Sequence, residues 1–331
     1  MEEYSGVMVY GEIAGHKLAS TTCELLECGR KLALDLGQSL SCVLAGQVPA
    51  GVIEEAASRG AATVYTADLA GVTAPDTETH LAVAVAASNE ARPSIILTGH
   101  TALGRELGPR LAFRLGTAIA TDCIDLKIEP QSHRLMMTKP VYGGNALADF
   151  VAGTVPQVAT VRPKAVSAGD PEAGRTARTV ALNVQMPSAK VMVKDRIIEE
   201  VTGVKLEDAA VVVSGGRGVG GPGPFTTVLK ELADVLHGAV GASRPACDNG
   251  WAPEAMHIGL TGKIVAPELY IAVAISGASQ HMAGCSGSKT VVAVNKDAEA
   301  NIFREATYGV VGKFEDVVPA FTAKLRELLA D

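Results

Sequence analysis

Large aromatic side chains are scarce in this sequence. Phe, Tyr and Trp together make up 4% of the 331 residues, with a single Trp, whereas Gly alone occurs 35 times. This composition disfavours a sheet sandwich built around bulky side chains and suits closely packed α/β layers. At this length there is room for about two domains, each with a core of its own.

Long apolar runs and basic stretches are also missing. No run reaches the roughly 18 apolar residues that a membrane-spanning helix needs, and the start, Met1-Glu-Glu-Tyr, lacks the profile of a signal peptide. We therefore expect a soluble protein of the bacterial cytoplasm, with no membrane span. The net charge is −7 and no Lys/Arg-rich stripe is present, which argues against nucleic acid as a partner.

Cysteine occurs six times without one C-x-x-C pair. That spacing counts against a four-cysteine iron–sulfur site, and we expect no metal site. It also favours a reducing compartment. Each cysteine is interpreted as a small buried apolar residue. The six are Cys23, Cys28, Cys42, Cys123, Cys247 and Cys285.

Short apolar runs alternate with amphipathic stretches over the first hundred residues. Val7–Tyr10 and Ser41–Ala45 have the composition of strands, and each is followed by a helical pattern, at Thr21–Leu36 and Val52–Ser58. Such alternation predicts parallel strands joined by right-handed crossovers. Further along, extended runs follow one another with little helix. The sequence therefore predicts an N-terminal parallel α/β domain with a strand-rich end.

A charged, mixed segment then precedes renewed β/α alternation. We interpret about Arg196–Asp208 as the connection, so that the predicted domains are 1–200 and 208–331. The second domain is predicted to be doubly wound. Its main predicted elements are strands at Ala210–Val213, Leu269–Ile275 and Thr290–Val294, and helices at Phe225–Leu236 and Val317–Leu329.

The stretch Thr261–His281 carries the strongest signal for a ligand. Its run Leu269–Ile275 is apolar and β-branched, as expected for a strand covered on both faces. Ser276, Gln280 and His281 then add side-chain donors beside a helix start, where free backbone N–H groups favour phosphate. The alternative is an ordinary turn capped by Ser276, with Gln280 and His281 solvated.

Three further polar groups follow strands in the second domain. Arg217 lies in the glycine-rich run Ser214-Gly-Gly-Arg-Gly, Arg244 follows Ser243, and Asn295 follows the strand Thr290–Val294. Alone, each also fits a turn or a surface ion pair. Because carboxyl ends of parallel strands share one edge of a sheet, one extended dinucleotide would touch them all.

These residues carry a resemblance to the alpha subunit of electron transfer flavoproteins, over nearly the whole chain. The pieces include Ser214-Gly-Gly-Arg-Gly, Gly241-Ala-Ser-Arg, Thr261-Gly-Lys-Ile-Val-Ala-Pro-Glu-Leu-Tyr, Ile275-Ser-Gly-Ala-Ser-Gln-His and Val294-Asn-Lys-Asp. The resemblance implies a heterodimer with a beta subunit, in which the second domain holds one FAD and the first builds the interface. AMP or a second FAD is expected in the beta subunit.

The resemblance also implies roles for individual residues. The FAD phosphates and nearby chain would contact Arg217, Ser243 and Ser276, with the backbone of Gly277 and Ala278. The isoalloxazine ring would be surrounded by Arg244, Thr261, Gln280 and His281, with His281 as a donor, and Asn295 would lie on the adenosine side. Leu260 and Ser279 complete the candidate set.

Two positions depart from the family pattern. Leu260 stands where some relatives carry Gln, and Lys313 stands where an Asp near the adenine is common. A Lys side chain cannot accept a hydrogen bond from an adenine amino group. Asp316 or a backbone carbonyl would have to substitute.

The resemblance implies an electron carrier and no self-sufficient enzyme. Electrons would arrive from a flavin dehydrogenase, foremost an acyl-CoA dehydrogenase of fatty acid β-oxidation, and leave to a quinone-linked or other acceptor oxidoreductase. An alternative within the family is a bifurcating complex that uses NADH and ferredoxin or flavodoxin. A non-redox adenine-nucleotide-binding module is the other class. A nicotinamide enzyme is disfavoured because the sequence lacks the G-x-G-x-x-G turn.

In the first domain, Thr98-Gly-His-Thr101 follows a predicted strand and resembles a phosphate-binding turn. We interpret its His100 as structural or as part of an interface. Arg105 and Arg110 on the following helix are interpreted as solvated or interface charges.

Overall fold

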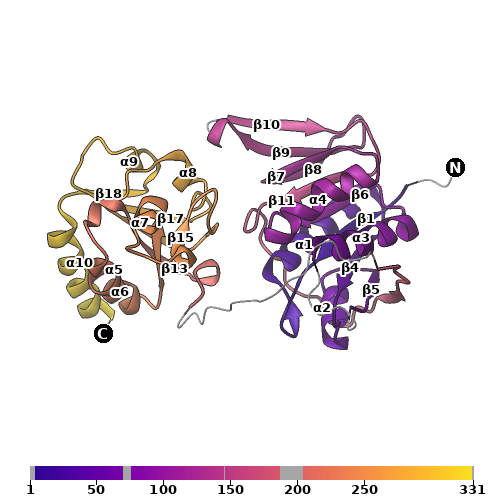
Figure 1. The fold of residues 1–331 in the computed structure, drawn as a ribbon, viewed down its shortest axis with the longest axis horizontal. Coiled ribbons are helices and arrows are strands. Elements are labelled where there is room, and N and C mark those ends of the chain that lie inside the picture. Colours follow the sequence, from indigo (N-terminus) through magenta and orange to yellow (C-terminus); the bar gives the residue numbers. More distant parts are fainter. Residues whose placement is uncertain (1–3, 70–75, 145, 187–203, 330–331) are drawn as a thin grey trace. The chain divides into compact units, whose positions relative to one another are not determined.

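A computed structural model describes residues 4–69, 76–144, 146–186 and 204–329 (Figure 1). The chain groups into two compact units, which are described separately. The first comprises Met1–Val141 and Ala146–Ile197, and the second Ile198–Asp331 with Tyr142–Asn145. Most of the predicted connection, Arg196–Asp208, lies outside the described residues.

The first unit is built on a seven-stranded parallel sheet, in the order β12-β5-β4-β1-β6-β11-β7. Its central strand, β1 (Val7–Gly11), is buried throughout. Val7 and Val9 face one core while Met8 and Tyr10 face another, which is the alternation expected of a strand covered on both sides. The other strands are β4 (Leu40–Ala45), β5 (Thr63–Ala67), β6 (Ile95–Gly99), β7 (Ile119–Cys123), β11 (Gln157–Val161) and β12 (Arg178–Ala181).

Helices cover both faces of this sheet. Helices α1 (Ser20–Leu36) and α2 (Ala50–Ser58) contribute to the core of Val7 and Val9. Helices α3 (Thr77–Ala91) and α4 (Ala102–Arg114) contribute to the core of Met8 and Tyr10. The crossovers predicted from sequence thus form a doubly covered parallel sheet.

Part of the predicted strand-rich end forms a separate antiparallel sheet, in the order β10-β9-β8, whereas β7 and β11 join the parallel sheet. Its strands are β8 (Asp125–Ile128), β9 (Leu135–Val141) and β10 (Ala146–Val151). A small antiparallel pair, β2 (Ile13–Ala14) with β3 (Lys17–Leu18), completes the unit among the described residues.

The second unit contains a six-stranded parallel sheet in the order β15-β14-β13-β16-β17-β18. The chain runs outward from β13 in one direction and then returns to extend the sheet in the other. This is the doubly wound order in which ligands bind where the direction reverses. The strands are β13 (Val211–Gly215), β14 (Ala239–Ser243), β15 (His257–Ile258), β16 (Leu269–Val273), β17 (Thr290–Asn295) and β18 (Tyr308–Val311).

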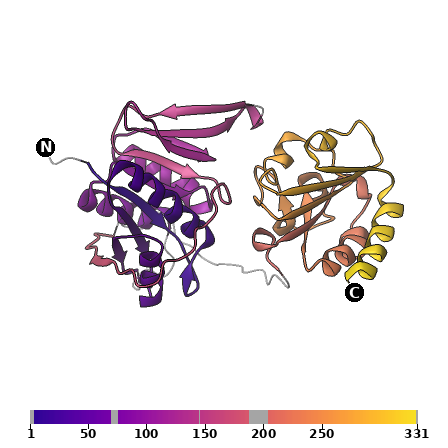
Figure 2. The same cartoon turned by 180° about the vertical axis from the view of Figure 1, so that it is seen from behind.

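Short helices join these strands, and one long helix closes the unit. Helix α10 lies beside α6 on one face of the sheet (Figures 1 and 2). Phe314 and Val318 of α10 pack there with Leu229 and Leu232 of α6. The helices are α5 (Gly223–Thr226), α6 (Val228–Val235), α7 (Arg244–Asp248), α8 (Ser279–Met282), α9 (Ile302–Glu305) and α10 (Phe314–Leu329).

The fold class predicted from sequence is confirmed, with local differences. The single helix predicted over Phe225–Leu236 is wrong, because Thr227, with φ −117° and ψ −101°, separates α5 from α6. The strand predicted to reach Ile275 ends at Val273, since Ala274 adopts a φ of 52°. The edge strand β18 was not predicted. All four of its residues are exposed, so it lacks the buried apolar signal of a central strand.

Candidate functional site

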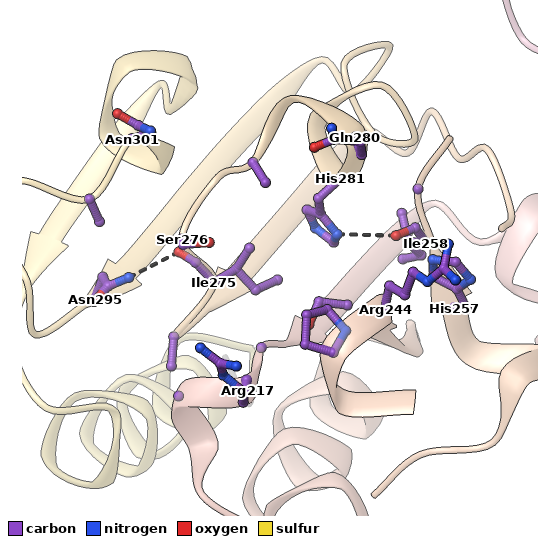
Figure 3. Close-up of a pocket in the computed structure, with 18 of the residues that line it drawn as sticks. Arg217, Arg244, His257, Ile258, Ile275, Ser276, Gln280, His281, Asn295 and Asn301 are labelled. Atoms are coloured by element: carbon purple, nitrogen blue, oxygen red, sulfur yellow. Dashed lines mark hydrogen bonds between the residues drawn. The ribbon is translucent and has the colours of Figure 1, made fainter. Parts of the chain in front are cut away.

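A cavity of about 760 Å³ lies in the second unit at the carboxyl ends of β13, β14, β16 and β17. This is the edge at which the strand order reverses between β13 and β16. Figure 3 shows its labelled side chains. Those of Asn295 and Asn301 lie at one end, Arg217 lies near the middle, and Arg244 and His257 lie at the other end. The site is therefore elongated and polar along its length.

The structure brings most of the predicted site residues together. Gly277 and Ser279 of the candidate set are outside the lining, although both neighbour lining residues. The members that line the cavity are Arg217, Ser243, Arg244, Leu260, Thr261, Ser276, Ala278, Gln280, His281 and Asn295.

Close backbone approach brings together the loops beside the cavity. A Cβ atom at Gly216 would lie 2.1 Å from the carbonyl oxygen of Ala274, and one at Gly277 would lie 2.3 Å from the backbone nitrogen of Ile302. Gly277 also has a φ of 83°. Only glycine satisfies both constraints without movement of the neighbouring chain. The glycine-rich turns let two loops meet and leave space above them.

The helix predicted to start after Ser276 is much shorter than the sequence suggested. Helix α8 is a single turn of four residues, and no side chain caps it. A helix this short adds little macrodipole. The predicted contribution from a helix terminus is therefore corrected: the donors at this edge come from the Ser276–Ala278 loop and from side chains.

Asn295 ties two strand ends together at one end of the cavity. Its Nδ2 donates to the carbonyl oxygen of Ile275 over 2.9 Å (Figure 3), and its Oδ1 accepts from the backbone N–H of Asp297 over 3.0 Å. The backbone N–H of Ile302 donates to the carbonyl of Ser276 over 3.0 Å. These bonds hold the loop after β16 against the loop after β17.

Arg244 supplies positive charge at the other end. Its Nη1 lies 3.4 Å from Oγ1 of Thr261, and its Nε lies 3.6 Å from a carboxylate oxygen of Asp248. The Arg244 side chain is 62% exposed. It can therefore turn toward a ligand at little cost in packing.

His281 is buried in the wall behind the cavity. Its Nδ1 lies 3.1 Å from the carbonyl oxygen of Ile258 (Figure 3), and its Nε2 lies 2.9 Å from the hydroxyl of Tyr270. Burial lowers the pKa of His281 to about 4, partly offset by the bond to Ile258. The imidazole is therefore neutral at pH 7, with both ring nitrogens engaged inside the protein.

Several lining residues were missed by sequence reasoning. His257 is buried, and its Nδ1 lies 2.9 Å from Oε1 of Glu254. The spacing of three residues between Glu254 and His257 is only a weak signal in the sequence, because nothing in the sequence places the short strand β15 beside β14. Asp297, Glu299 and Asn301 also line the cavity, on the loop that follows β17.

The turn Thr98–Thr101 of the first unit, which resembles a phosphate-binding turn, makes hydrogen bonds within the protein. Nδ1 of His100 lies 2.8 Å from Oγ1 of Thr160, and Thr101 caps α4 through Gly104. Asp122 forms a bidentate ion pair with Arg162, with N···O distances of 2.8 and 2.7 Å. Burial is the largest cause of the lowered pKa of His100. These contacts fit the structural interpretation of His100.

The described residues contain neither a candidate metal site nor a candidate membrane-spanning helix. No group of three or more His, Cys, Asp or Glu side chains in the described part of the chain is placed to hold a metal ion. None of the helices within the described ranges is both long and apolar enough to cross a membrane.

Comparison with known proteins gives two family matches. Residues 7–187 match the electron transfer flavoprotein domain, and residues 205–286 match the electron transfer flavoprotein FAD-binding domain. The second match includes all the lining residues from Gly216 to His281.

Relatives are similar over nearly their whole length. The chain is 37% identical to the electron transfer flavoprotein subunit alpha of Megasphaera elsdenii, covering 99% of this chain and 98% of that protein. It is 38% identical to the protein of the same name in Bacillus subtilis strain 168, over 97% and 98%. The acryloyl-CoA reductase electron transfer subunit beta of Anaerotignum propionicum is 32% identical, over 99% and 97%.

Proposed function

Since this chain belongs to the electron transfer flavoprotein alpha subunit family, we propose that it is an electron carrier that binds one FAD in the cavity of its second unit. The observation that carries this proposal is the position of the cavity. It lies at the reversal point of a doubly wound parallel sheet, within and just beyond the segment that matches a FAD-binding domain.

The residues of the cavity fit such a ligand in three respects. Its volume of about 760 Å³ falls within the range of cofactor sites. Gly216, Gly218 and Gly259 are among the residues that line it, and glycine allows close approach of a pyrophosphate. Arg217 and Ser276 lie near the middle, where the phosphates of an extended dinucleotide would be, and both can interact with anionic oxygens.

We infer the direction of the ligand from the two ends of the cavity. Asn295 and Asn301 offer amide groups suited to an adenosine, whereas Arg244 and Thr261 offer a cation and a hydroxyl suited to a ring that gains negative charge. FAD, when bound, accepts and releases electrons at its isoalloxazine ring. In this direction, Leu260, Gln280 and His281 lie near the ring, while Ser243 and the Ser276–Ser279 turn, with Gly277 and Ala278, lie nearer the phosphates.

Lys313 stands at the position where an Asp near the adenine is common in the family, so the acceptor for the adenine amino group must come from another residue. Lys313 is absent from the residues that line the cavity, whereas Asp297 and Glu299 line it at the Asn295 end. A carboxylate oxygen accepts a hydrogen bond from an amino group, which Lys313 cannot do. We therefore propose that Asp297 or Glu299 offers the acceptor on the adenosine side.

The partners follow from the family. We propose a heterodimer with a beta subunit that carries AMP or a second FAD, with domain 1–200 at the interface and domain 208–331 holding the flavin. Electrons would come from a flavin dehydrogenase acting on acyl-CoA and pass to an acceptor oxidoreductase. The bacterial cytoplasm is the proposed compartment.

A bifurcating role is the second candidate. It is favoured by the relative named acryloyl-CoA reductase electron transfer subunit beta, since that name couples electron transfer to a reductase of a CoA ester. Such a complex would carry a second FAD in the beta subunit. The chain's own cavity serves either role.

The deciding experiment counts cofactors in the purified heterodimer. Both subunits are expressed together, and FAD and AMP are quantified after release from the protein. A yellow complex with one FAD and one AMP supports simple electron transfer, and two FAD support bifurcation. A colourless complex that binds adenine nucleotide would overturn the flavoprotein proposal and favour a non-redox module.

A further inference from the structure

The sheet of the first unit has a reversal point of its own, between β1 and β6. From β1 the chain adds β4 and β5 on one side of the sheet and then returns to place β6 on the other. Tyr10 pairs with Thr98, so the two strands end at the same level. Glu12 is the first residue after β1, and His100 is the first after β6. In open parallel sheets this is the position at which ligands bind.

The side chain of Glu12 lies at this reversal point. Its Oε1 accepts a hydrogen bond from the hydroxyl of Thr101 over 2.6 Å, and Thr101 in turn caps α4 through the backbone N–H of Gly104. A Cβ atom at Gly99 would lie 3.7 Å from Oε1 of Glu12. The carboxylate therefore lies over the glycine of the turn 98–101, the turn whose sequence resembles a phosphate-binding site.

The backbone of Glu12 is fixed at both of its polar groups. Its N–H donates to Oγ1 of Thr22 over 2.7 Å. Its carbonyl oxygen accepts from the same hydroxyl over 2.9 Å and from the N–H of Ala19 over 3.0 Å. Thr22 is buried in the first turn of α1, with an exposed fraction of 1%. Contacts with the starts of α1 and α4 thus hold the carboxylate in place.

The carboxylate of Glu12 has no cation beside it in the described part of the chain. There its side chain bonds only to Thr101. The neighbouring rings are engaged elsewhere: the Tyr10 hydroxyl lies 2.8 Å from Nδ1 of His80, and Nδ1 of His100 bonds to Thr160. Burial raises the pKa of Glu12, and the bond from Thr101 offsets part of that rise. An uncompensated, half-buried carboxylate repels any further anion that approaches the same turn.

We propose that Glu12 excludes nucleotides from the first unit, because its carboxylate occupies the phosphate position of the turn 98–101 and repels anionic ligands. Two parallel sheets of the same kind then differ at their reversal points. In the second unit this point opens into a cavity of about 760 Å³, whereas in the first it holds the side chain of Glu12. The role of Glu12 does not depend on which ligand the second unit binds.

Removing the side chain of Glu12 should open the position to a phosphate. Glu12→Ala and Glu12→Ser are compared with native protein in the purified heterodimer, and binding of added AMP is measured by equilibrium dialysis. We expect both variants to bind the added AMP about tenfold or more tightly than native protein does, since the repulsion is gone and the Thr101 hydroxyl can donate to a phosphate oxygen. Native-like AMP binding in variants that keep the native circular dichroism would overturn the proposal.

Glu106→Ala is the matched control. Glu106 is exposed on α4, and its Oε2 likewise accepts a hydrogen bond from a threonine hydroxyl, that of Thr77, over 2.6 Å. The substitution removes the same charge and the same kind of bond but leaves the turn 98–101 unchanged, so AMP binding should equal that of native protein. A gain as large as in Glu12→Ala would show that net charge alone controls binding, which would contradict the proposal.

The imidazole of His100 shows where the added AMP binds. The sequence has seven histidines, so ¹⁵N-histidine labelling of this chain gives a small set of signals, and His100→Gln assigns the one from the turn. AMP should move this signal in Glu12→Ala and leave it unchanged in native protein. A response of His100 to AMP in native protein would overturn the proposal, and this measurement requires no variant of Glu12.

The same complex separates this proposal from the proposed function. A heterodimer without flavin would overturn the proposed function. Binding of AMP in the second unit would then be equal in native protein and in Glu12→Ala, because the second unit is the same in both. The difference in AMP binding and the His100 signal would therefore still decide the role of Glu12.

Discussion

Arg244 is the residue with which the proposed function can be tested most directly. Its guanidinium keeps its charge, and its side chain is exposed at the end of the cavity assigned to the flavin ring. A hydrogen bond to a charged group contributes about 1.5–3 kcal/mol, which corresponds to roughly 60–130 mV for one electron. Because Arg244 is well exposed, solvent screening favours the lower end of that range.

We therefore expect Arg244→Ala to lower the midpoint potential of the bound flavin by about 60 mV. Spectroelectrochemical titration of the heterodimer measures this shift. The control is Arg326→Ala, which removes an exposed guanidinium of α10 paired with Glu231 and outside the cavity lining. Equal potentials for native protein and Arg244→Ala would remove Arg244 from the ring end.

His281 makes the second unit sensitive to acid. The folded protein holds this imidazole neutral down to about pH 4, whereas in the unfolded chain it takes up a proton near pH 6.5. Between these values the unfolded state binds more protons, so the free energy of unfolding falls as the pH drops from 6.5 to 4. The loss is on the order of 3 kcal/mol at pH 4, and His281 contributes none of the pH dependence well above pH 7.

Urea unfolding followed by Trp251 measures this loss, because the only Trp of the chain lies in the second unit. His281→Gln should flatten the acid slope relative to native protein. His237→Asn is the control, since His237 is exposed and its φ of 52° suits Asn. A slope as steep in His281→Gln as in native protein would show that other groups cause the acid sensitivity.

At the scale of elements, the turns after β13 and β16 decide whether the cavity exists. Gly277→Ala adds a Cβ that collides with the backbone of Ile302 and also strains a φ of 83°. We expect a loss of about 1–3 kcal/mol in unfolding free energy and release of the bound flavin, as the loops after β16 and β17 separate.

Gly220→Ala is the matched control. Gly220 has a φ of 78°, but a Cβ there would meet no atom within 4 Å. It therefore carries only the conformational cost of a left-handed residue, about 1 kcal/mol. Trp251 fluorescence and flavin absorbance of both variants test the difference. Equal stability and equal flavin content in the two variants would show that the contact with Ile302 is not required.

At the scale of the whole molecule, two separate sets of cores divide the chain. The cores of the first unit draw on residues from Val7 to Leu182 and Val184, and those of the second on residues from Leu206 to Leu325. No core in the described part of the chain mixes the two. Proteins built this way commonly unfold in more than one step.

We expect the unfolding midpoint from Trp251 fluorescence to differ from the midpoint from far-ultraviolet circular dichroism, which reports both units. Adding FAD should move the Trp251 midpoint by the equivalent of about 2.7 kcal/mol at a concentration 100 times Kd. Flavin quenching changes the amplitude, so midpoints are compared. Coincident midpoints that shift together on adding FAD would indicate one cooperative unit.

Much of this protein could be predicted from its sequence. The apolar runs at β1 and β16 carry their own evidence of burial on two faces, and the glycine-rich turns mark where the chain must approach itself closely. Placing Arg217, Ser276 and Asn295 at carboxyl ends of parallel strands was enough to predict that they share a site. Ten of the twelve candidate residues line the same cavity.

Other features depended on contacts between distant parts of the chain. The break at Thr227, the end of β16 before Ala274 and the exposed edge strand β18 depend on backbone angles and neighbours that local pattern does not carry. The order of the strands, and with it the side of the sheet on which His257 lies, exists only in the folded sheet.

Local sequence pattern was enough to predict two α/β domains and the polar residues that meet at one sheet edge, because strand burial and strand-end chemistry are local properties. The tertiary structure alone decided how each polar group is used. Ile258 and Tyr270 belong to different strands, β15 and β16, and each contacts one ring nitrogen of His281. These contacts depend on where β15 and β16 lie in the folded sheet, which local sequence pattern does not carry.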